Sequence, residues 1–302
     1  MEKNELTHFL EEGYLRLPKA IPAPLLGRLH ELFDDLMSQR DVEGLLVANE
    51  IDGVSYIANI ETPCWRGNLA ALETLGFPLI QEVARTICGE EFFCIQDFAV
   101  VKMLGDNMPI GWHQDMLHER TGHCFGMGIY LDSAGAGDGA LRVVPRSHTS
   151  GRNIRELRHE PSIEVPMEAG DILIQDMMLA HASGPLTHRP LRRVLYFIFL
   201  SAPQVRRENL YPQALITRRT QVLEIAIEYY RRQHPPLPEW NTPLLDLVQD
   251  PENLRKELAE LYREPIRPRP SAYYFEMPTE AKNARQPPGH RASFNTTGTT
   301  RP

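Results

Sequence analysis

Trp112-His113-Gln114-Asp115 is the stretch on which the interpretation of this chain depends, together with His181 farther along. Residues i and i+2 of a β-strand point to the same face, so His113 and Asp115 can reach one metal ion from one strand or its frayed end. Two His and one carboxylate form the facial triad of non-haem Fe(II) sites, which leaves coordination positions open. An isolated His-x-Asp is common in surface loops, however, and the chain has 11 His from which a third ligand could come. The triad therefore gains weight only from its surroundings.

Apolar and β-branched runs on both sides of this stretch predict strands. Upstream they occupy residues 92–95 and 98–101, and downstream residues 194–200 form a continuous apolar run typical of a buried strand. The strand pattern therefore places the two parts of the triad in a β-rich region.

Arg192 and Ser183 follow His181 and give the triad its specificity. A guanidinium binds a carboxylate in a bidentate manner, which Lys cannot do. Arg192 shares a strand face with Val194, whereas the adjacent Arg193 points the other way. We therefore expect Arg192 to face the metal and to hold the far carboxylate of a metal-chelating dicarboxylate, with Ser183 as a further donor. The alternative is that both arginines are solvated surface charges.

Other segments match one known family in the same order along the chain. The matching segments are His113-x-Asp115, His181-x-Ser183, Arg192, the Gly-Tyr step within 9–15, Lys-Met-Leu-Gly at 102–105, 139–148 and Glu-Ala-Gly-Asp at 168–171. Over about residues 5 to 203 the chain resembles the phytanoyl-CoA dioxygenase family of Fe(II)/2-oxoglutarate oxygenases. The resemblance implies a mainly β fold with flanking helices, built on a double-stranded β-helix (jelly-roll, cupin-like) core. It also implies decarboxylation of 2-oxoglutarate to succinate.

The resemblance also implies roles for individual residues. His113, Asp115 and His181 would be the metal ligands and the catalytic centre, and Arg192, Ser183 and Lys102 would bind 2-oxoglutarate. Lys102 could instead be an edge-strand lysine whose stem packs on apolar surface. Candidates for contact with the substrate are Gln96, which shares a strand face with Lys102, and Tyr56, Asn59 and Trp65 in the segment before the strands; for Trp65, core packing is the competing explanation.

Two positions depart from the family pattern. Arg146 follows Pro145 where relatives usually have Gly, and a turn with positive φ tolerates Arg less well, so we expect a turn of different type. Gly128 lies near where many relatives have Trp, which suggests a roomier pocket, unless it is an ordinary glycine near a loop. Asp115 is retained, and this favours hydroxylation, desaturation or a related oxygen-driven outcome over halogenation.

Composition limits the partners of the chain. Its 302 residues can form one domain, 42% of them are hydrophobic, and the formal net charge is −8 without a basic cluster. This argues against nucleic acid and anionic membranes and disfavours a highly anionic substrate. The 4 Cys lack zinc or redox spacing, and no secretory or membrane-spanning segment is evident. We therefore expect a cytoplasmic protein with free thiols.

The chain divides by pattern into an oxygenase domain and a tail. We expect residues 1–263 to form a single domain, with N-terminal helices over 1–91, the β-helix core over about 92–203 and a helical extension over 204–263. Helical periodicity marks 22–38, 67–89, 221–233 and 251–263, whereas 39–66 is predicted irregular. The extension could pack on the barrel, form a lid or mediate a homodimer. Residues 264–302 are rich in Pro and predict an extended tail.

These observations lead to one expected function and two kinds of alternative. The expectation is an Fe(II)/2-oxoglutarate-dependent dioxygenase that uses O2, with ascorbate as a candidate reductant. Its substrate is expected to be a bulky intermediate of secondary metabolism. An acyl-CoA or a free amino acid is the alternative substrate. The alternative from another class is a non-catalytic or 2-oxoglutarate-independent cupin-like metal-binding protein, which would not need the Arg192 carboxylate clamp.

Overall fold

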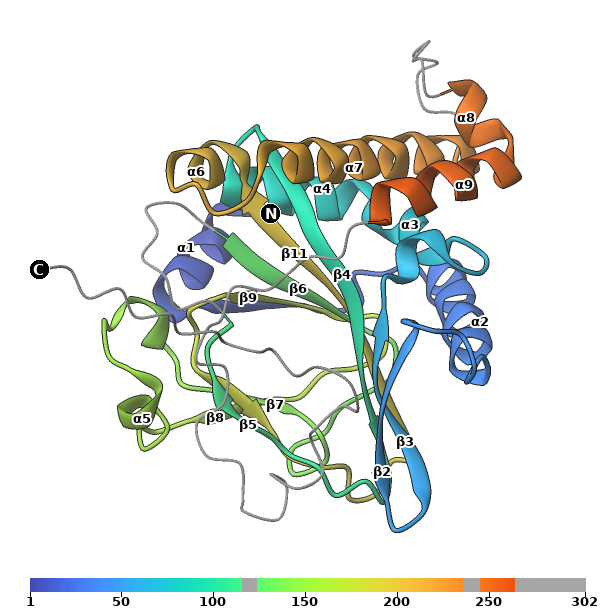
Figure 1. The fold of residues 1–302 in the computed structure, drawn as a ribbon. Helices are drawn as coiled ribbons and strands as arrows, with labels where there is room; N and C mark the ends of the chain where they lie inside the picture. The colour runs from blue at the N-terminus through green and yellow to red at the C-terminus, as the bar shows by residue number, and fades with distance from the viewer. Residues whose placement is uncertain (116–123, 236–244, 264–302) are drawn as a thin grey trace, which may run out of the picture.

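Two antiparallel sheets form the centre of the molecule in the computed structural model, which describes residues 1–115, 124–235 and 245–263. The seven-stranded sheet has the order β1 (Tyr14–Leu17), β9 (Ile172–Asp176), β6 (Cys124–Tyr130), β11 (Leu191–Ser201), β4 (Phe92–Met103), β3 (Val54–Glu61) and β2 (Leu46–Ile51). The four-stranded sheet has the order β5 (Ile110–His113), β10 (His181–Ser183), β7 (Leu141–Val143) and β8 (Ile163–Val165). The predicted jelly-roll core with flanking helices is confirmed (Figure 1).

Helices cover the face of the large sheet that is turned away from the small sheet (Figure 1). We call this face the outer face, and the face toward the small sheet the inner face. The helices of the described ranges are α1 (Lys3–Glu12), α2 (Ala23–Ser38), α3 (Ala70–Leu75), α4 (Pro78–Cys88), α5 (Ile154–Leu157), α6 (Ala202–Arg207), α7 (Gln213–Gln233), α8 (Leu245–Gln249) and α9 (Pro251–Tyr262), with short 3-10 turns η1 (Pro63–Trp65) and η2 (Ser147–Thr149). The short helix α5 does not cover the outer face and lies beside the small sheet (Figure 1).

Alternation along β11 separates structural from site residues. Leu195, Phe197 and Phe199 belong to the large apolar cluster under the helices, whereas Val194 and Tyr196 belong to the cluster between the sheets. Because side chains alternate along a strand, Arg192 lies on the inner face, as the sequence predicts. Its backbone pairs with Lys102 on β4, so both side chains share that face.

The segment 39–66 was predicted to be irregular, and this is wrong. It contains the hairpin of β2 and β3, and β3 pairs with β4 in the large sheet. The turn is Asp52-Gly53, where both residues have positive φ (51° and 77°). Asp-Gly is a typical sequence of such two-residue hairpin turns. Strands of the core therefore begin well before residue 92.

The predicted helix over 67–89 is also wrong as a single helix. It is divided into α3 and α4, and Pro78 occupies the first turn of α4, where the missing N–H costs nothing. Gly76 lies at the break against α7: a Cβ built there would be 2.0 Å from the carbonyl oxygen of Ala226. The close approach of α7 requires this glycine.

The C-terminal helices pack on the barrel. Val222 and Ala226 of α7 and Leu258 of α9 join the apolar cluster on the outer face. The Tyr262 hydroxyl at the end of α9 donates a 2.7 Å hydrogen bond to buried Asp97 on β4. These helices thus pack on the outer face of the large sheet. Formation of a dimer through them stays a prediction. The predicted tail, 264–302, falls outside the described residues.

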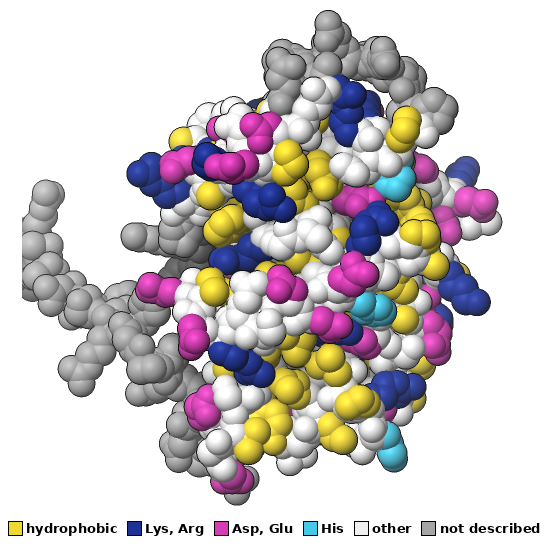
Figure 2. Space-filling view, turned by 90° about the vertical axis from the view of Figure 1, so that its right-hand side faces the viewer, with side chains coloured by type: hydrophobic (Ala, Val, Ile, Leu, Met, Phe, Trp, Pro, Cys, Tyr) yellow, Lys and Arg dark blue, Asp and Glu magenta, His cyan; other side chains and the backbone are white. Residues whose placement is uncertain are grey.

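Acidic and basic side chains are interspersed on the described part of the face shown in Figure 2. No helix in the described ranges is both long enough and apolar enough to cross a bilayer.

Candidate metal centre

His113, Asp115 and His181 meet at one point between the sheets. His113 and His181 are directly paired across β5 and β10, and the Asp115 backbone N–H donates to the Met177 carbonyl at 2.9 Å. One candidate ligand atom from each residue lies within 4.8 Å of the other two. His113 Nε2 lies 3.4 Å from Asp115 Oδ1, and His181 Nε2 lies 3.8 Å from Asp115 Oδ2. The structure thus brings the predicted triad together.

Both imidazoles are oriented by the same local contact. His113 Nδ1 lies 2.8 Å from the carbonyl oxygen of Gly111, and His181 Nδ1 lies 2.8 Å from that of Leu179. A carbonyl accepts only from a protonated nitrogen, so Nδ1 carries the hydrogen in each ring. Nε2 is then left as the donor atom for a metal, an arrangement usual for His ligands.

Gln175 on β9 is a site residue that the sequence analysis missed. Its Nε2 donates to Asp115 Oδ2 at 3.1 Å and lies 3.4 Å from His181 Nε2. It therefore holds the carboxylate of the triad from the large sheet. The available signal was a Gln directly after the apolar run Ile172-Leu173-Ile174, but periodicity alone does not show which group such a residue contacts.

Burial and mutual charge shift the pKa values of the triad. Burial opposes ionisation of Asp115, but His181, His113 and Gln175 outweigh it and lower the pKa of Asp115 to about 2. Burial and then the charge of His113 lower the pKa of His181 to about 4. Burial also disfavours the charged form of His113, yet its contacts with Asp115 leave its pKa raised. Near neutral pH, the carboxylate is charged and His181 is neutral, the forms that bind metals.

Arg192 and Ser183 are buried in positions suited to an anion. Arg192 is 1% exposed, and its Nη1 donates to the Gly139 carbonyl at 2.9 Å. Its Nε and the Ser183 hydroxyl are buried and form no hydrogen bond in the described structure. Such groups are rare unless a ligand or water satisfies them. Lys102, 2% exposed, pairs with Arg192 and donates to the Met108 carbonyl at 3.0 Å.

Tyr196 lies on the same strand and the same face as Arg192, and it corrects the expectation of a roomier pocket at Gly128. Burial raises the pKa of the Tyr196 hydroxyl, and the charges of Arg192 and Asp115 also act on this pKa. A Cβ on Gly128 would be 2.9 Å from Tyr196 Cε1 and 3.1 Å from Val194 Cγ1. The tyrosine ring thus fills the space that the glycine leaves, and no cavity results there.

Arg146 corrects the second expectation, that the turn after Pro145 changes type. Arg146 has φ 65° and ψ 3°, so it adopts the left-handed conformation that glycine favours. Its N–H donates to the Glu12 carbonyl at 3.0 Å and its Nε to the Glu12 carboxylate at 2.8 Å. These contacts hold the turn, and the next residue, Ser147, accepts the Ala180 N–H at 2.8 Å, beside His181.

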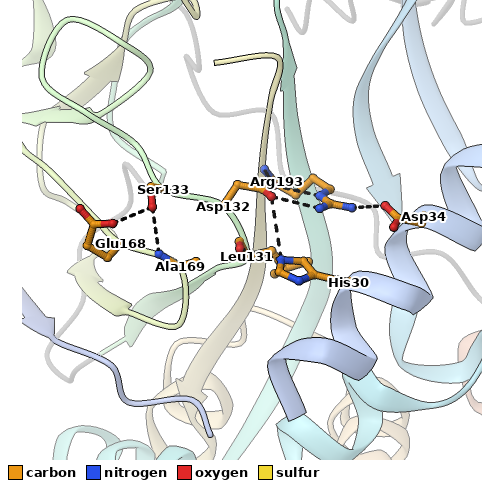
Figure 3. Close-up of polar contacts among 8 residues, drawn as sticks. All are labelled: His30, Asp34, Leu131, Asp132, Ser133, Glu168, Ala169 and Arg193. Carbon is orange, nitrogen blue, oxygen red and sulfur yellow. Dashed lines mark hydrogen bonds and ion pairs between the residues drawn. The ribbon is translucent and has the colours of Figure 1, made fainter. Parts of the chain in front are cut away.

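Buried Arg193 forms a separate network of polar contacts on the outer face (Figure 3). Its Nε and Nη2 donate to the two oxygens of Asp132 at 2.9 and 3.0 Å, and its backbone N–H donates to Asp132 Oδ2 at 2.8 Å. Nη1 reaches Asp34 on α2, and His30 of the same helix contacts the Leu131 carbonyl at 2.8 Å. The ion pairs of Arg193 therefore join α2 to the ends of β6 and β11. Arg193 has a structural role and is not a solvated charge.

The four substrate candidates separate in the structure. Asn59 pairs with Val100, and Gln96 pairs with Ile198, which places both on the inner face. Tyr56 lies beside the turn after β4, where a Cβ on Gly105 would be 3.1 Å from its hydroxyl. Trp65 packs against the outer-face cluster and donates to Thr62 Oγ1 at 3.1 Å. The structure thus does not bring Trp65 to the inner face, and core packing accounts for it.

Three solved structures share this fold, and the descriptions of two of them name 2-oxoglutarate (alpha ketoglutarate). EvdMO1 is 24% identical with a TM-score of 0.61, over 66% of this chain and 50% of that chain, so this chain spans half of EvdMO1. The epimerase SnoN, in complex with Fe3+, alpha ketoglutarate and nogalamycin RO, is 15% identical with a TM-score of 0.56, over 66% and 82%. EctD from S. alaskensis, with 2-oxoglutarate and 5-hydroxyectoine, is 18% identical with a TM-score of 0.58, over 68% and 77%.

Comparison with curated proteins finds no match. A family profile described as Phytanoyl-CoA dioxygenase (PhyH) matches residues 9–194, which is more than half of the 302 residues. The resemblance of the motifs is thereby confirmed, and the chain belongs to the phytanoyl-CoA dioxygenase family.

Proposed function

We propose that this protein is an Fe(II)/2-oxoglutarate-dependent dioxygenase that oxidises a C–H bond of a small organic molecule and releases succinate and CO2. The family and the solved neighbours support an Fe/2-oxoglutarate-dependent enzyme. The observation that carries the proposal is the combination of the His-Asp-His triad with the buried guanidinium of Arg192, whose Nε has no partner in the described structure. A site that only held a metal would not need that cation.

The triad would hold Fe(II) through Nε2 of His113, Nε2 of His181 and the carboxylate of Asp115. These are nitrogen and oxygen donors of the kind that non-haem Fe(II) sites use. Backbone carbonyls fix both rings, and the Gln175 amide fixes the carboxylate. The ligands are thus held in position before a metal arrives, which reduces the cost of ordering them on binding.

Arg192 would bind the distal carboxylate of 2-oxoglutarate. The free Nε–H and the Ser183 hydroxyl supply donors for a carboxylate, and a charged pair of this kind is favoured in a dry site. Lys102, on the neighbouring strand and the same face, adds positive charge. Tyr196, on the same strand and face as Arg192, would form part of the wall of this site.

The iron, 2-oxoglutarate and O2 would together supply the oxidising chemistry, with ascorbate as a candidate external reductant. The protein would orient the substrate along the inner face, where Tyr196 is buried and alternate residues of β4 are partly exposed. We propose a bulky natural-product intermediate as the substrate. The support is the partly exposed inner face at Gln96, Phe98 and Val100 and the likeness to SnoN, which was solved with nogalamycin RO.

The test is an anaerobic titration of the purified protein with Fe(II) and then with 2-oxoglutarate, followed by the visible charge-transfer absorption of the chelate. We expect the band in the wild type, no metal binding in His113→Ala, and metal binding without the band in Arg192→Ala. Arg206→Ala is the matched control, because Arg206 is an exposed arginine paired with Glu91 on the surface, and it should behave as the wild type.

Metal binding without any band in the wild type would refute the use of 2-oxoglutarate. That result would favour a cupin-like metal-binding protein. A band that persists in Arg192→Ala would refute only the role of Arg192 and would leave the use of 2-oxoglutarate in place. Once the band is established, succinate release in the presence of candidate compounds identifies the substrate, and acyl-CoA and free amino acids belong in that screen.

A further inference from the structure

Glu61 is an acidic residue on the inner face that the metal centre does not use. It ends β3 and pairs with Phe98 of β4, and paired residues of antiparallel strands point to the same face. Along β4, the residues of the helix-covered face are buried at 97, 99 and 101, whereas those of the inner face at 96, 98 and 100 are only partly buried. Glu61 and Asn59 are likewise partly exposed. This end of the inner face is therefore accessible.

Neighbouring side chains lead from Glu61 through Phe98 to Tyr196 on β11. The Phe98 ring stacks on Tyr196 with a centroid distance of 5.4 Å and an interplanar angle of 17°, and the hydroxyl of Tyr196 feels the charge of Asp115. β3 is two strands away from β11 in the sheet, which corresponds to about 10 Å at the usual strand spacing. A molecule that lies across the stacked rings of Phe98 and Tyr196 would extend from Glu61 to β11.

The carboxylate of Glu61 lacks a close counter-charge. Within the described ranges it forms no ion pair, and its polar contact is a hydrogen bond from the Asn59 amide. Burial and then the charge of Asp97 raise the pKa of Glu61, while the hydrogen bond from Asn59 and the charge of Arg66 act in the opposite direction. A partly buried, unpaired carboxylate in a site is costly unless a ligand compensates it.

We propose that Glu61 binds a cationic nitrogen of the substrate, with the side-chain carbonyls of Asn59 and Gln96 as further acceptors. An ammonium carries three donors and no acceptor, which suits a carboxylate flanked by amide oxygens. The net charge of −8 also favours a cation over an anion. The substrate class would be small organic molecules that carry a protonated amine for Glu61 at a distance from the oxidised carbon, which would lie at the metal centre. This inference rests on the proposed function and names the substrate class of the same site.

The test compares amines with alcohols of the same skeleton. Protein loaded anaerobically with Fe(II) and 2-oxoglutarate is titrated by calorimetry with tryptamine and tryptophol, glucosamine and glucose, and 1,6-diaminohexane and 1,6-hexanediol. We expect the amine to bind about tenfold to a hundredfold more tightly in at least one pair, as for hydrogen bonds between charged groups. Glu61→Gln should abolish this preference. Glu50→Gln is the control, since it removes the same charge from an exposed position on the same hairpin.

Two results would overturn the inference. One is a set of pairs in which no amine binds more tightly than its alcohol, and the other is a preference that survives in Glu61→Gln. The charge-transfer band of the loaded protein is recorded first. If the band is missing, the proposed function fails; if the band is present without an amine preference, only the assignment of Glu61 fails.

Discussion

Gly128→Ala should destabilise the protein because Tyr196 already occupies the space beside the glycine. The added Cβ would lie 2.9 Å from Tyr196 Cε1 and 3.1 Å from Val194 Cγ1, whereas carbon atoms prefer about 3.5–4.0 Å. Relief requires movement of a ring that is 8% exposed and stacked on Phe98. Overpacking of this kind costs about 1–3 kcal/mol.

Gly126→Ala is the matched control, because Gly126 lies on the same strand and the same face. There a Cβ would meet its nearest atom, Ile198 Cδ1, at 3.4 Å, which is close to ordinary contact. Both substitutions remove the flexibility of a strand glycine, which by itself favours the alanine variant by about 0.5–1 kcal/mol. This contribution cancels when the two variants are compared, so the difference between them reports the contact with Tyr196.

The free energy of unfolding is measured from urea denaturation of the two variants and the wild type. We expect Gly126→Ala to be as stable as the wild type or slightly more stable, and Gly128→Ala to be about 1–3 kcal/mol less stable than Gly126→Ala. Equal stabilities would refute the reasoning. They would mean that the space over Gly128 is open, as the sequence comparison with relatives suggested.

Three further predictions follow from the site and the helices. Arg192→Lys should raise the KM for 2-oxoglutarate about 10- to 100-fold, because a charged hydrogen bond is lost, and should leave the affinity for Fe(II) unchanged. Steady-state succinate release measures this KM, and an unchanged KM would contradict the prediction. Because the pKa of His181 is lowered to about 4 from 6.5, only the unfolded state takes up this proton as the pH falls from 6.5 to 4. The free energy of unfolding of the metal-free protein should then fall by up to about 3 kcal/mol. The raised pKa of His113 makes this loss smaller, because the folded state binds that proton more tightly than the unfolded state. Urea denaturation at pH 7 and pH 4.5 measures the change, and greater stability at pH 4.5 would contradict the prediction. Tyr262→Phe should cost about 1–3 kcal/mol, since buried Asp97 loses a donor, and the free energy of unfolding by urea tests it against the wild type.

Local spacing along the chain predicted much of the metal centre. The i, i+2 spacing of His113 and Asp115 predicted that one stretch supplies two ligands, and alternation along 192–198 predicted that Arg192 faces inward. Arg192 follows the two-residue period of its strand, whereas β5 ends at His113 and Asp115 lies just beyond it, where its N–H donates to the Met177 carbonyl. The apolar runs predicted the β core.

Tertiary structure decided which distant groups meet. Gln175 reaches Asp115, Tyr196 fills the space beside Gly128, and Glu12 holds Arg146 in a left-handed conformation. None of these contacts joins neighbours in sequence. The period of a strand determines the face on which a side chain lies, but the strand beside it follows from how the whole chain packs. For that reason the spacing predicted the ligands, whereas the groups that orient them and shape the space around them emerged only from the folded chain.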